Sequence, residues 1–554
     1  MSADSLMYRL ATGAVGAIAL LVCLDVLAAQ AQSASPRAPS TMTQAPGLDT
    51  SSVPAADPGS VLPEGWQRGT FIEIFVRGYK DSDGDGIGDL RGLTQSLDYL
   101  HELGIRGIWL MPITSSQDHD HGYAVSNYRD IEPAYGSLAD FDELLKQAHA
   151  RGIGVIFDYV INHSAAENPL FLDASASADS RYRAWYVWRD VAPTGWEIYG
   201  KNPWVSMPTG AYLAQFSKTM PDFNMLNPEV VAYHKDNLRF WLNRGVDGFR
   251  FDAVTHLVEN GPDAWQDQPA DYALMNEVRA LVDTYSRRYV VCEAPVNAAA
   301  YAAPTVCGGA FAFARAQDIV NAARGDRDAI DSIANYFSTA PAGMASMISS
   351  HDLYAGERLW DQVHGDLTQY RLAAATYLLQ PGTPFIYYGE EIGMSAGKGL
   401  SGDPKLRTPM SWTADPGNAG FSTARPYRVV SSNVARQNVA SQRASSNSLL
   451  AYYKAMLALR NRYPSIARGS YDAPFVDGKV MGYRRSFGDE STLVLINYGK
   501  KPATVAVRGM AATSIFRPVF PANDGKPLAV DATGASKVAV AAQSVRVFVS
   551  DPPR

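Results

Sequence analysis

The sequence is poor in cysteine and has no excess of positive charge. Its 554 residues contain three cysteines, too few for a disulfide-dense scaffold. Lys and Arg number 49 against 56 Asp and Glu, so the net charge is -7. Because no surplus of cations is available to neutralise phosphates, we expect no nucleic-acid partner. The 46% of hydrophobic residues predict a globular protein large enough for several domains.

The sequence also lacks an apolar run near its N-terminus that is long enough to span a membrane. The run over residues 11–24 ends at Asp25, whereas a membrane-spanning helix needs roughly 20 apolar residues. Ala29-Gln30-Ala31 follows, and this order is typical of a signal peptide with its cleavage site. We therefore predict a signal peptide over residues 1–31, export to the periplasm or the medium, and no stable membrane span after cleavage.

The predicted export bears on the three cysteines. Cys23 lies in the signal peptide, so Cys292 and Cys307 remain in the mature chain. In an oxidising compartment these two residues could form a disulfide. Their spacing along the chain does not fix their separation in space, so a pair of buried free thiols is an equally good expectation.

Eight short apolar runs alternate with amphipathic helical stretches, which end at glycines such as Gly104 and Gly152. Strands that alternate with helices predict a parallel sheet, and eight of them predict a closed (β/α)8 TIM barrel of the α/β class. A doubly wound open sheet is the competing fold. The expected strands cover residues 70–76, 107–111, 155–160, 248–251, 289–292, 310–313, 345–348 and 385–388.

The pattern changes outside this alternation. Residues 32–65 are rich in Ser, Ala, Pro and Thr, which predicts a flexible linker. Residues 162–222 contain many aromatic side chains without a clear helix and strand pair, which indicates a subdomain inserted after the third strand. Beyond residue 465 the pattern has a period of two with turn residues between strands, which predicts a C-terminal antiparallel β-sandwich. The expected domains are therefore a barrel over 66–161 and 223–465, an insertion over 162–222, and a β domain over 466–554.

Acidic side chains stand where several of the expected strands end. In a barrel of this kind the strand ends on one face build the active site. A single acid after a strand is usually a helix cap or a solvated side chain, but four such clusters converge here. They are Asp158 to His163, Gly248 to Asp252, Cys292-Glu293, and His351-Asp352.

These stretches resemble the α-amylase family of glycoside hydrolases, and the resemblance runs from about residue 69 to the C-terminus. Besides the four clusters, it covers residues 107–112, 220–224 and 382–390 in the expected order. The resemblance implies a barrel, an inserted subdomain and a C-terminal β domain. Ser350 stands where the family usually has Asn, and residues 220–224 are intermediate between two subfamilies, the oligo-1,6-glucosidase and neopullulanase types.

Carried over by position, the resemblance implies that Asp252 is the nucleophile, Glu293 the general acid and base, and Asp352 a third carboxylate that supports the distorted sugar. A retaining glycosidase needs one ionised and one protonated carboxyl, about 5 to 5.5 Å apart. We therefore expect the charges of the two aspartates to raise the pKa of Glu293. Arg250 projects from the same strand and to the same side as Asp252, so it is expected to keep that carboxylate ionised.

Other matching positions are implied to bind the substrate. His163 and His351 resemble histidines that hydrogen-bond the sugar next to the cleaved bond, and Tyr123 resembles the tyrosine that stacks on that sugar. Asp158 is expected to organise the site. His256 resembles a residue on the leaving-group side.

An aspartate-rich loop follows the first expected strand. Asp81, Asp83, Asp85 and Asp89 occupy the first, third, fifth and ninth positions, with Ile87 offering a backbone carbonyl. This is the oxygen-ligand spacing of a calcium loop, although Gly92 replaces the Glu of an EF-hand. Related family members carry a similar structural calcium loop. The alternative is an acidic turn that caps the next helix.

The leading functional hypothesis is an α-amylase-like enzyme that hydrolyses α-1,4-glucosidic bonds in starch and maltooligosaccharides. The sequence leaves the oligomeric state open, and a monomer is favoured. An internal cut is expected because Ala124 follows Tyr123, where exo-acting relatives carry an Asp that grips the terminal sugar with an arginine. Asp118 or Asp120 could nevertheless fill that place. An exo-acting α-glucosidase or a transglucosylase is the alternative, and a catalytically inactive binding subunit is a third possibility.

Overall fold

The computed structural model describes residues 47–522 and 525–550. The predicted signal peptide and residues 32–46 of the predicted linker lie outside this part of the chain. Within it, no helix combines the length and the apolar character needed to cross a membrane.

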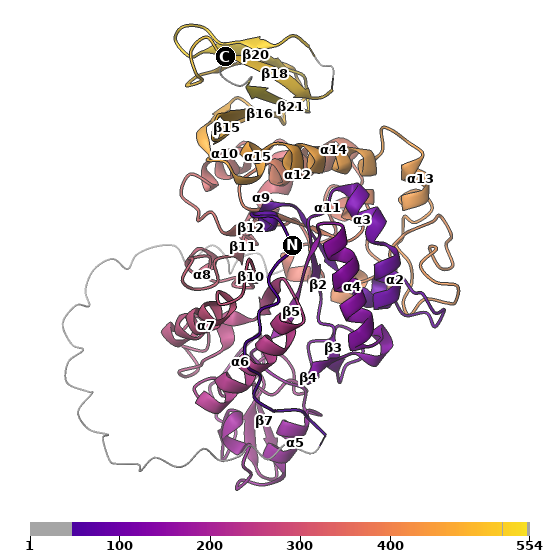
Figure 1. The fold of residues 1–554 in the computed structure, drawn as a ribbon, viewed down its shortest axis with the longest axis vertical. Helices are drawn as coiled ribbons and strands as arrows, with labels where there is room; N and C mark the ends of the chain where they lie inside the picture. Colours follow the sequence, from indigo (N-terminus) through magenta and orange to yellow (C-terminus); the bar gives the residue numbers. More distant parts are fainter. Residues whose placement is uncertain (1–46, 523–524, 551–554) are drawn as a thin grey trace, which may run out of the picture. The chain divides into compact units, whose positions relative to one another are not determined.

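Eight parallel strands form a closed barrel in the order β1-β13-β12-β11-β10-β9-β5-β2 (Figure 1). Each of the expected strands is present, and closure of the sheet excludes the doubly wound alternative. The fold prediction of a (β/α)8 barrel is therefore confirmed. The strands are β1 (Phe71–Ile74), β2 (Gly107–Leu110), β5 (Gly154–Val160), β9 (Gly248–Asp252), β10 (Tyr289–Cys292), β11 (Ala310–Phe311), β12 (Met344–Ser346) and β13 (Thr383–Tyr387).

Helices connect the strands, and local sequence sets where they begin and end. Ser137 and Asp140 form a reciprocal capping box at the start of α4. Gly104 ends α3 in a left-handed conformation with a φ of 99°, which glycine adopts without steric cost. The helices of the barrel and its C-terminal extension are α1 (Val76–Tyr79), α2 (Leu90–Gln95), α3 (Leu97–Leu103), α4 (Leu138–Ala150), α6 (Pro228–Asn243), α7 (Pro269–Val282), α8 (Ala298–Tyr301), α9 (Ala314–Ala323), α10 (Arg327–Tyr336), α11 (Leu359–Gln362), α12 (Leu367–Leu379), α13 (Val439–Arg443), α14 (Leu449–Arg462) and α15 (Pro464–Arg468).

The barrel encloses a small core that is separate from the large core between strands and helices. Side chains alternate along each strand, so one set of residues points inward and the next set points to the helices. The inward set is dominated by large side chains, which fill the barrel and leave the polar strand ends to form a site. This inner core contains Leu62, Trp66, Phe71, Trp109, Ile156, Tyr289, Val291, Phe311, Ala345, Met347 and Phe385.

Residues 47–65 pack against the barrel, which differs from the flexible linker expected there. Leu62 is buried with 1% of its surface exposed, and it joins the inner core. The backbone N–H of Val53 donates to Asp236, and the Asp57 carboxylate accepts from the backbone and hydroxyl of Ser286. No sequence pattern predicts this packing, because an extended segment held by scattered hydrogen bonds has no apolar period.

Two insertions follow the second and third barrel strands. A hairpin of β3 (Thr114–Ser116) and β4 (Val125–Ile131) comes first. The second insertion contains α5 (Pro169–Ala176) and a three-stranded sheet in the order β6-β8-β7, formed by β6 (Trp188–Arg189), β7 (Trp204–Met207) and β8 (Gly210–Leu213). A small apolar cluster around Trp204 packs this sheet, so some of its aromatic residues are structural.

The chain ends in an antiparallel β domain, whose strands are coloured orange to yellow in Figure 1. A six-stranded sheet has the order β14-β15-β16-β21-β18-β19, and β17 pairs with β20. Apolar side chains of both sheets form one core, as expected for a sandwich. The strands are β14 (Asp472–Asp477), β15 (Val480–Phe487), β16 (Glu490–Asn497), β17 (Ala503–Val507), β18 (Ile515–Phe520), β19 (Leu528–Ala529), β20 (Ser536–Val540) and β21 (Ser544–Ser550).

Two buried glutamates follow the last barrel strand. Glu390 is 3% exposed, and its Oε1 accepts hydrogen bonds from the hydroxyls of Tyr377 (2.6 Å) and Tyr453 (2.8 Å). Glu391 is fully buried and accepts from the hydroxyl of Tyr99 at 2.7 Å. Burial raises the pKa of Glu390 to about 7, against the effect of the two tyrosines.

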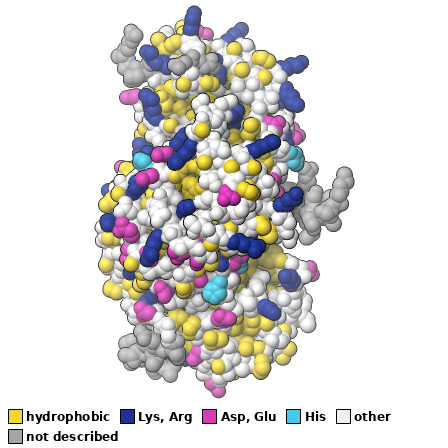
Figure 2. Space-filling model, turned by 90° about the vertical axis from the view of Figure 1, so that its right-hand side faces the viewer, with side chains coloured by type: hydrophobic (Ala, Val, Ile, Leu, Met, Phe, Trp, Pro, Cys, Tyr) yellow, Lys and Arg dark blue, Asp and Glu magenta, His cyan; other side chains and the backbone are white. Residues whose placement is uncertain are grey.

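On the face shown in Figure 2, acidic and basic side chains are interspersed. No large area of one charge stands out on this face. This distribution agrees with the composition, which offers no positive surplus for a polyanionic partner.

Candidate active site

The strand ends bring the expected polar residues together around one arginine. Arg250 lies on β9 and is almost fully buried. Its Nη1 donates to Asp158 at 2.6 Å and to Asp252 at 2.7 Å, while its Nη2 donates to Glu293 at 2.6 Å. Because these acids come from β5, β9 and the end of β10, the guanidinium joins three neighbouring strands at one edge of the barrel.

The carboxyls of Asp252 and Glu293 form a coupled pair with unequal environments. Burial raises the pKa of Asp252 well above its ordinary value, and the charge of Glu293 raises it further against the effect of Arg250. Burial also raises the pKa of Glu293, but Arg250, the hydroxyl of Tyr354 and the Ala253 N–H together bring it below its ordinary value. The charge of Asp352 raises the pKa of Glu293, as expected, but Arg250, which contacts both acids, outweighs it, so the pKa of Glu293 in the free protein is lowered rather than raised.

Asp352 lies in a second charged cluster beside the first. His351 is held between the carboxylates of Glu73 and Asp352, with 3.1 Å between its Nε2 and Asp352 Oδ2. Burial favours the neutral ring, but the two carboxylates outweigh it and raise the pKa of His351 to about 10. Burial opposes ionisation of Asp352, yet His351 and Arg407 lower its pKa far below the ordinary value. Arg407 Nη2 contacts Asp352 Oδ1 at 2.7 Å. These contacts therefore favour the ionised form of Asp352 near neutral pH.

Tyr123 connects the two clusters. Its hydroxyl donates to Asp158 Oδ2 at 2.8 Å and lies 2.6 Å from Nε2 of His351. The rings of Tyr123 and His351 stack with centroids 5.5 Å apart. Burial raises the pKa of Asp158 to about 6 despite the opposing effect of Arg250. Asp158 thus contacts other site residues, as its expected organising role requires.

The two remaining histidines of the expected site, His163 and His256, are buried, and burial favours the neutral form of both rings. Burial lowers the pKa of His163 to about 3, and its Nε2 is buried without a hydrogen-bond partner among the described residues. Burial also lowers the pKa of His256 to about 4. His256 stacks on Trp265 with centroids 5.4 Å apart, and its Nε2 lies 3.1 Å from the hydroxyl of Tyr199. An unpaired nitrogen and exposed aromatic edges are features that a sugar could use.

Several residues of the site escaped the sequence reasoning. Glu73 lies inside the apolar strand β1, and its side chain is fully buried against the charged cluster. The sequence signal that could have revealed it is a charged residue within an otherwise apolar strand. Tyr354, whose hydroxyl contacts Glu293, follows Asp352 by two positions. Arg407 lies in the long irregular segment after β13, where no periodicity points to a function.

A second ion pair stands next to this cluster. Arg428 Nη2 contacts both carboxylate oxygens of Asp120, at 3.0 and 2.8 Å. Its Nη1 donates to the carbonyl of Arg407, the residue that holds Asp352. Asp120 also precedes Tyr123 by three positions, whereas Ala124 is buried with 1% exposed. Asp120, one of two acids considered for the place left by Ala124, is therefore the one paired with an arginine.

The aspartate loop brings three of its expected ligands together. Oxygens of Asp81, Asp83 and Asp89 lie within 4.8 Å of one another, a hard oxygen donor set that suits Ca²⁺. Asp85 is outside this group, and its Oδ1 accepts from the backbone of Ile87 at 2.7 Å. Asp89 also caps α2, as the alternative reading expected.

The same loop contacts the segment that leads to Arg428. The N–H of Asp81 donates to the carbonyl of Phe421 at 3.1 Å, and the hydroxyl of Ser422 donates to the Asp81 carboxylate. The N–H of Tyr427 donates to the carbonyl of Gly86 at 2.9 Å. The loop therefore supports the chain immediately before the arginine.

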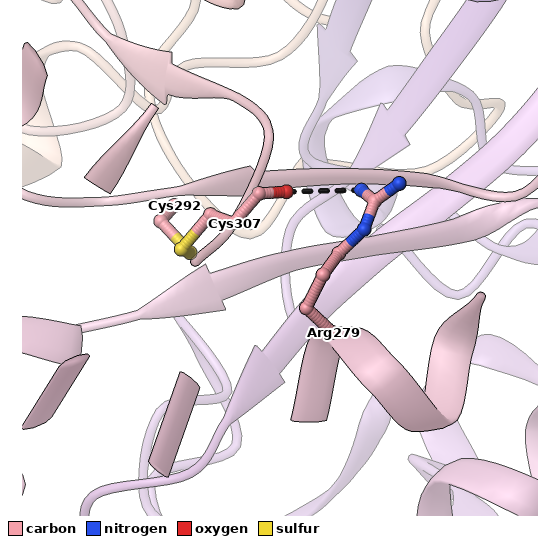
Figure 3. The surroundings of a disulfide bond; sticks show 3 residues. All are labelled: Arg279, Cys292 and Cys307. Atoms are coloured by element: carbon pink, nitrogen blue, oxygen red, sulfur yellow. Dashed lines mark hydrogen bonds between the residues drawn. A yellow bond between two sulfur atoms is a disulfide. The ribbon is translucent and has the colours of Figure 1, made fainter. Parts of the chain in front are cut away.

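The two cysteines left open by the sequence form a disulfide (Figure 3). Their Cα atoms are 6.1 Å apart, and both side chains are fully buried. Cys292 directly precedes Glu293, so the bond lies next to the charged cluster in the chain.

Comparison with known proteins gives consistent results. Residues 73–469 match the family model described as the alpha-amylase catalytic domain. The chain is 32% identical to "Alpha-amylase 3" of Dictyoglomus thermophilum, covering 79% of this chain and 86% of the relative. It is 30% identical to "Oligo-1,6-glucosidase" of Parageobacillus thermoglucosidasius, covering 79% and 91%. The crystal structure of an alpha-glucosyl transfer enzyme superposes with a TM-score of 0.75 at 27% identity, covering 88% of this chain and 99% of that one.

Proposed function

The chain belongs to the α-amylase family, and from this membership we propose that it is a retaining, exo-acting α-glucosidase or α-glucosyl transferase. The observation that carries the exo assignment is the Asp120–Arg428 pair beside the carboxylate cluster. The family includes both hydrolases and transglycosylases, so either water or a sugar hydroxyl can accept the glucosyl group. The relatives named oligo-1,6-glucosidase and alpha-glucosyl transfer enzyme also support this alternative over the internal cut.

The pair favours an end-on substrate for a geometric reason. A carboxylate and a guanidinium held together present acceptors and donors to the hydroxyls of one terminal sugar. Arg428 is 13% exposed in its side chain and Asp120 is 31% exposed, so the pair stands at a partly desolvated surface. A chain passing through the site would need this space. The absence of an acid at Ala124 is compensated by Asp120, which removes the main argument for an internal cut.

In the first step, Asp252 attacks the anomeric carbon while the bond from that carbon to the glycosidic oxygen breaks. Glu293 donates its proton to the departing oxygen, and a glucosyl–enzyme ester forms on Asp252. Asp352 and charged His351 hold the sugar hydroxyls from the side. Because the free protein favours an ionised Glu293, we propose that the entering sugar separates Glu293 from Arg250. The pKa of Glu293 then rises, while Arg250 stays with Asp252.

In the second step, water or a sugar hydroxyl replaces the leaving group. Glu293, now ionised, takes the proton of this acceptor, whose oxygen attacks the anomeric carbon and releases Asp252. Two inversions at one carbon give net retention. His256 and Trp265 lie on the acceptor side in this arrangement, so they would contact the incoming or departing group.

We further propose a structural Ca²⁺ in the aspartate loop. Asp81, Asp83 and Asp89 would hold it, with Asp85 and the carbonyl of Ile87 completing the expected set. The ion would neutralise crowded carboxylates. Its place next to residues 420–427 suggests support for the Arg428 segment rather than a part in bond cleavage.

Export to the periplasm or the medium is also proposed. The buried disulfide supports it, since such bonds form and persist in oxidising compartments. The mass of the mature protein purified from the culture medium and from the periplasm tests both the location and the cleavage after Ala31. A full-length protein found only in the cytoplasm would refute the proposal.

The experiment that tests exo action compares two substrates. Maltooligosaccharide nitrophenyl glycosides whose non-reducing end is blocked can be cut only internally, whereas the unblocked forms can be cut from the end. We expect rapid release of glucose or glucosyl products from the unblocked form and no cleavage of the blocked form. Internal cleavage of the blocked form would overturn the exo assignment. Glu293→Gln should abolish turnover of maltose, and full activity in that variant would overturn the mechanism.

A further inference from the structure

The Cys292–Cys307 disulfide lies in the chain beside the proposed acid. Cys292 is the last residue of β10, where Tyr289 and Val291 point into the barrel core and Val290 and Cys292 point to the outer layer. The next residue, Glu293, points inward again and contacts Arg250. The bond therefore fixes the outer side of the strand at the position directly before the acid.

The bond closes a ring of chain that starts at this strand end. The ring contains α8 and returns at Cys307, just before β11. Both ends are anchored: the N–H of Cys292 donates to the carbonyl of Gly309 at 2.9 Å, and Arg279 of α7 donates to the carbonyl of Cys307 at 3.0 Å. The disulfide thus links the end of β10 covalently to the buried end of the ring at Cys307.

The polar contacts of the Glu293 side chain come from outside this ring. Its carboxylate is held by Arg250, by the N–H of Ala253 and by the hydroxyl of Tyr354. In our mechanism the first of these contacts separates when the sugar enters. The backbone then carries more of the task of placing the carboxyl, and the disulfide holds that backbone one residue away.

The ring also reaches the acceptor side. Asn297 donates to the carboxylate of Asp267, whose other oxygen accepts from Tyr272 at 2.6 Å. The N–H of Asp267 donates to the carbonyl of Thr255 at 2.7 Å. Two residues earlier in the chain, Trp265 stacks on His256. The same ring therefore contacts the segment that carries the acceptor-side aromatic residue.

We propose that the Cys292–Cys307 disulfide is a positioning element for the general acid, which aligns Glu293 with the departing oxygen. This inference rests on the proposed function, because it assumes that Glu293 delivers a proton. Opening the bond leaves Asp252 and Arg250 in place and loosens the backbone at Glu293. The expected defect is thus specific to leaving groups that require protonation.

Leaving groups of different basicity provide the test. Maltose needs a proton on the departing oxygen, whereas α-glucosyl fluoride releases fluoride with little help from an acid. The value of kcat/KM reports the first step for both substrates. For Cys307→Ala we expect kcat/KM to fall about tenfold or more with maltose and by less than about threefold with the fluoride.

Val282→Ala is the matched control, because Val282 is a fully buried residue of α7 in the same outer layer with no part in the ring. This variant should lose stability without a change in the ratio of the two kcat/KM values. If Cys307→Ala does not fold, wild-type protein refolded with a reductant and assayed in it replaces the variant, with a thiol titration to confirm that the bond is open.

The outcomes separate the two proposals. Glu293→Gln is measured in parallel and should show the largest preference for the fluoride. Suppose that it does, but that opening the disulfide lowers kcat/KM equally for both substrates or for neither. The bond then has only a structural role, and the inference is overturned. If Glu293→Gln itself shows no preference, the acid assignment in the proposed function fails, and the inference fails with it.

Discussion

Glu390 should make the stability of the protein fall as the pH rises. Its pKa is about 7 in the folded protein against an ordinary value of 4.5, and burial is the cause. The folded state therefore keeps a proton that the unfolded chain releases between pH 4.5 and 7, so stability is lost as the pH rises through this window. The difference between 7 and 4.5 corresponds to a loss of about 3 kcal/mol in the free energy of unfolding, and this loss is complete above pH 7.

Glu390→Gln isolates this effect. A glutamine keeps an oxygen that can accept from Tyr377 and Tyr453, and it has no charge to bury. At pH 5, near the start of this window, the variant should exceed the wild type by less than about 1 kcal/mol. At pH 8 it should be more stable by up to about 3 kcal/mol, which is a rise of a few degrees in Tm for a protein of this size.

The assay is the thermal midpoint by fluorescence at pH 5, 6.5 and 8. Glu64→Gln serves as the control because the side chain of Glu64 is exposed, and its midpoint should follow the wild type at every pH. A gain for Glu390→Gln of the same size at pH 5 and pH 8 would refute the reasoning, since an electrostatic penalty must vanish when the carboxyl is protonated. A loss at pH 8 would show that the buried carboxylate is stabilised by groups we have not credited.

Four further outcomes follow from the structure. Asp120→Asn keeps the shape of the Arg428 partner but removes its charge. Because a hydrogen bond to a charged group contributes about 1.5–3 kcal/mol, kcat/KM for maltose should fall about ten- to hundredfold. An unchanged value would mean that the pair does not bind sugar. Leu62→Ala empties part of the barrel core and should cost about 2–5 kcal/mol in chemical unfolding with kcat unaltered; a stability equal to the wild type would show that the N-terminal segment is dispensable. Chelation of Ca²⁺ should lower the Tm and raise KM more than it changes kcat, because the loop supports the Arg428 segment; elemental analysis that finds no calcium would contradict the site. Cys307→Ala opens a loop of 15 residues and should cost about 3 kcal/mol of stability, measured by denaturant unfolding against Val282→Ala.

The barrel could be predicted from the sequence because buried strands have a distinctly apolar composition. Strands covered on both faces are continuously apolar, so β5 and β9 stand out against the polar loops. The carboxylates are visible for the related reason that they interrupt or end such runs. Asp158, Arg250, Asp252 and Glu293 are indeed found in one contact network.

What the sequence did not reveal depends on contacts between distant, irregular segments. Arg428 meets Asp120 across 308 positions, and no local pattern predicts such a pair. The packing of residues 47–65 is equally non-local, since Asp57 meets Ser286 across 229 positions. The order of the pKa values of Asp252 and Glu293 depends on which carboxylate oxygens Arg250 contacts. The spacing of motifs along the sequence does not determine such contacts.

The pairing of β1 with β13 also sets an order for biosynthesis. Phe71 pairs with Phe385, and Thr383 donates to the carbonyl of Gln67 across 316 positions. The ribosome must therefore release most of the chain before the first strand acquires its second neighbour. Until then an apolar strand edge is open to other chains, and closing so large a loop is slow. A chaperone that covers the segment around Phe71 during synthesis should raise the yield of soluble protein more than one that binds the late-forming C-terminal sheet.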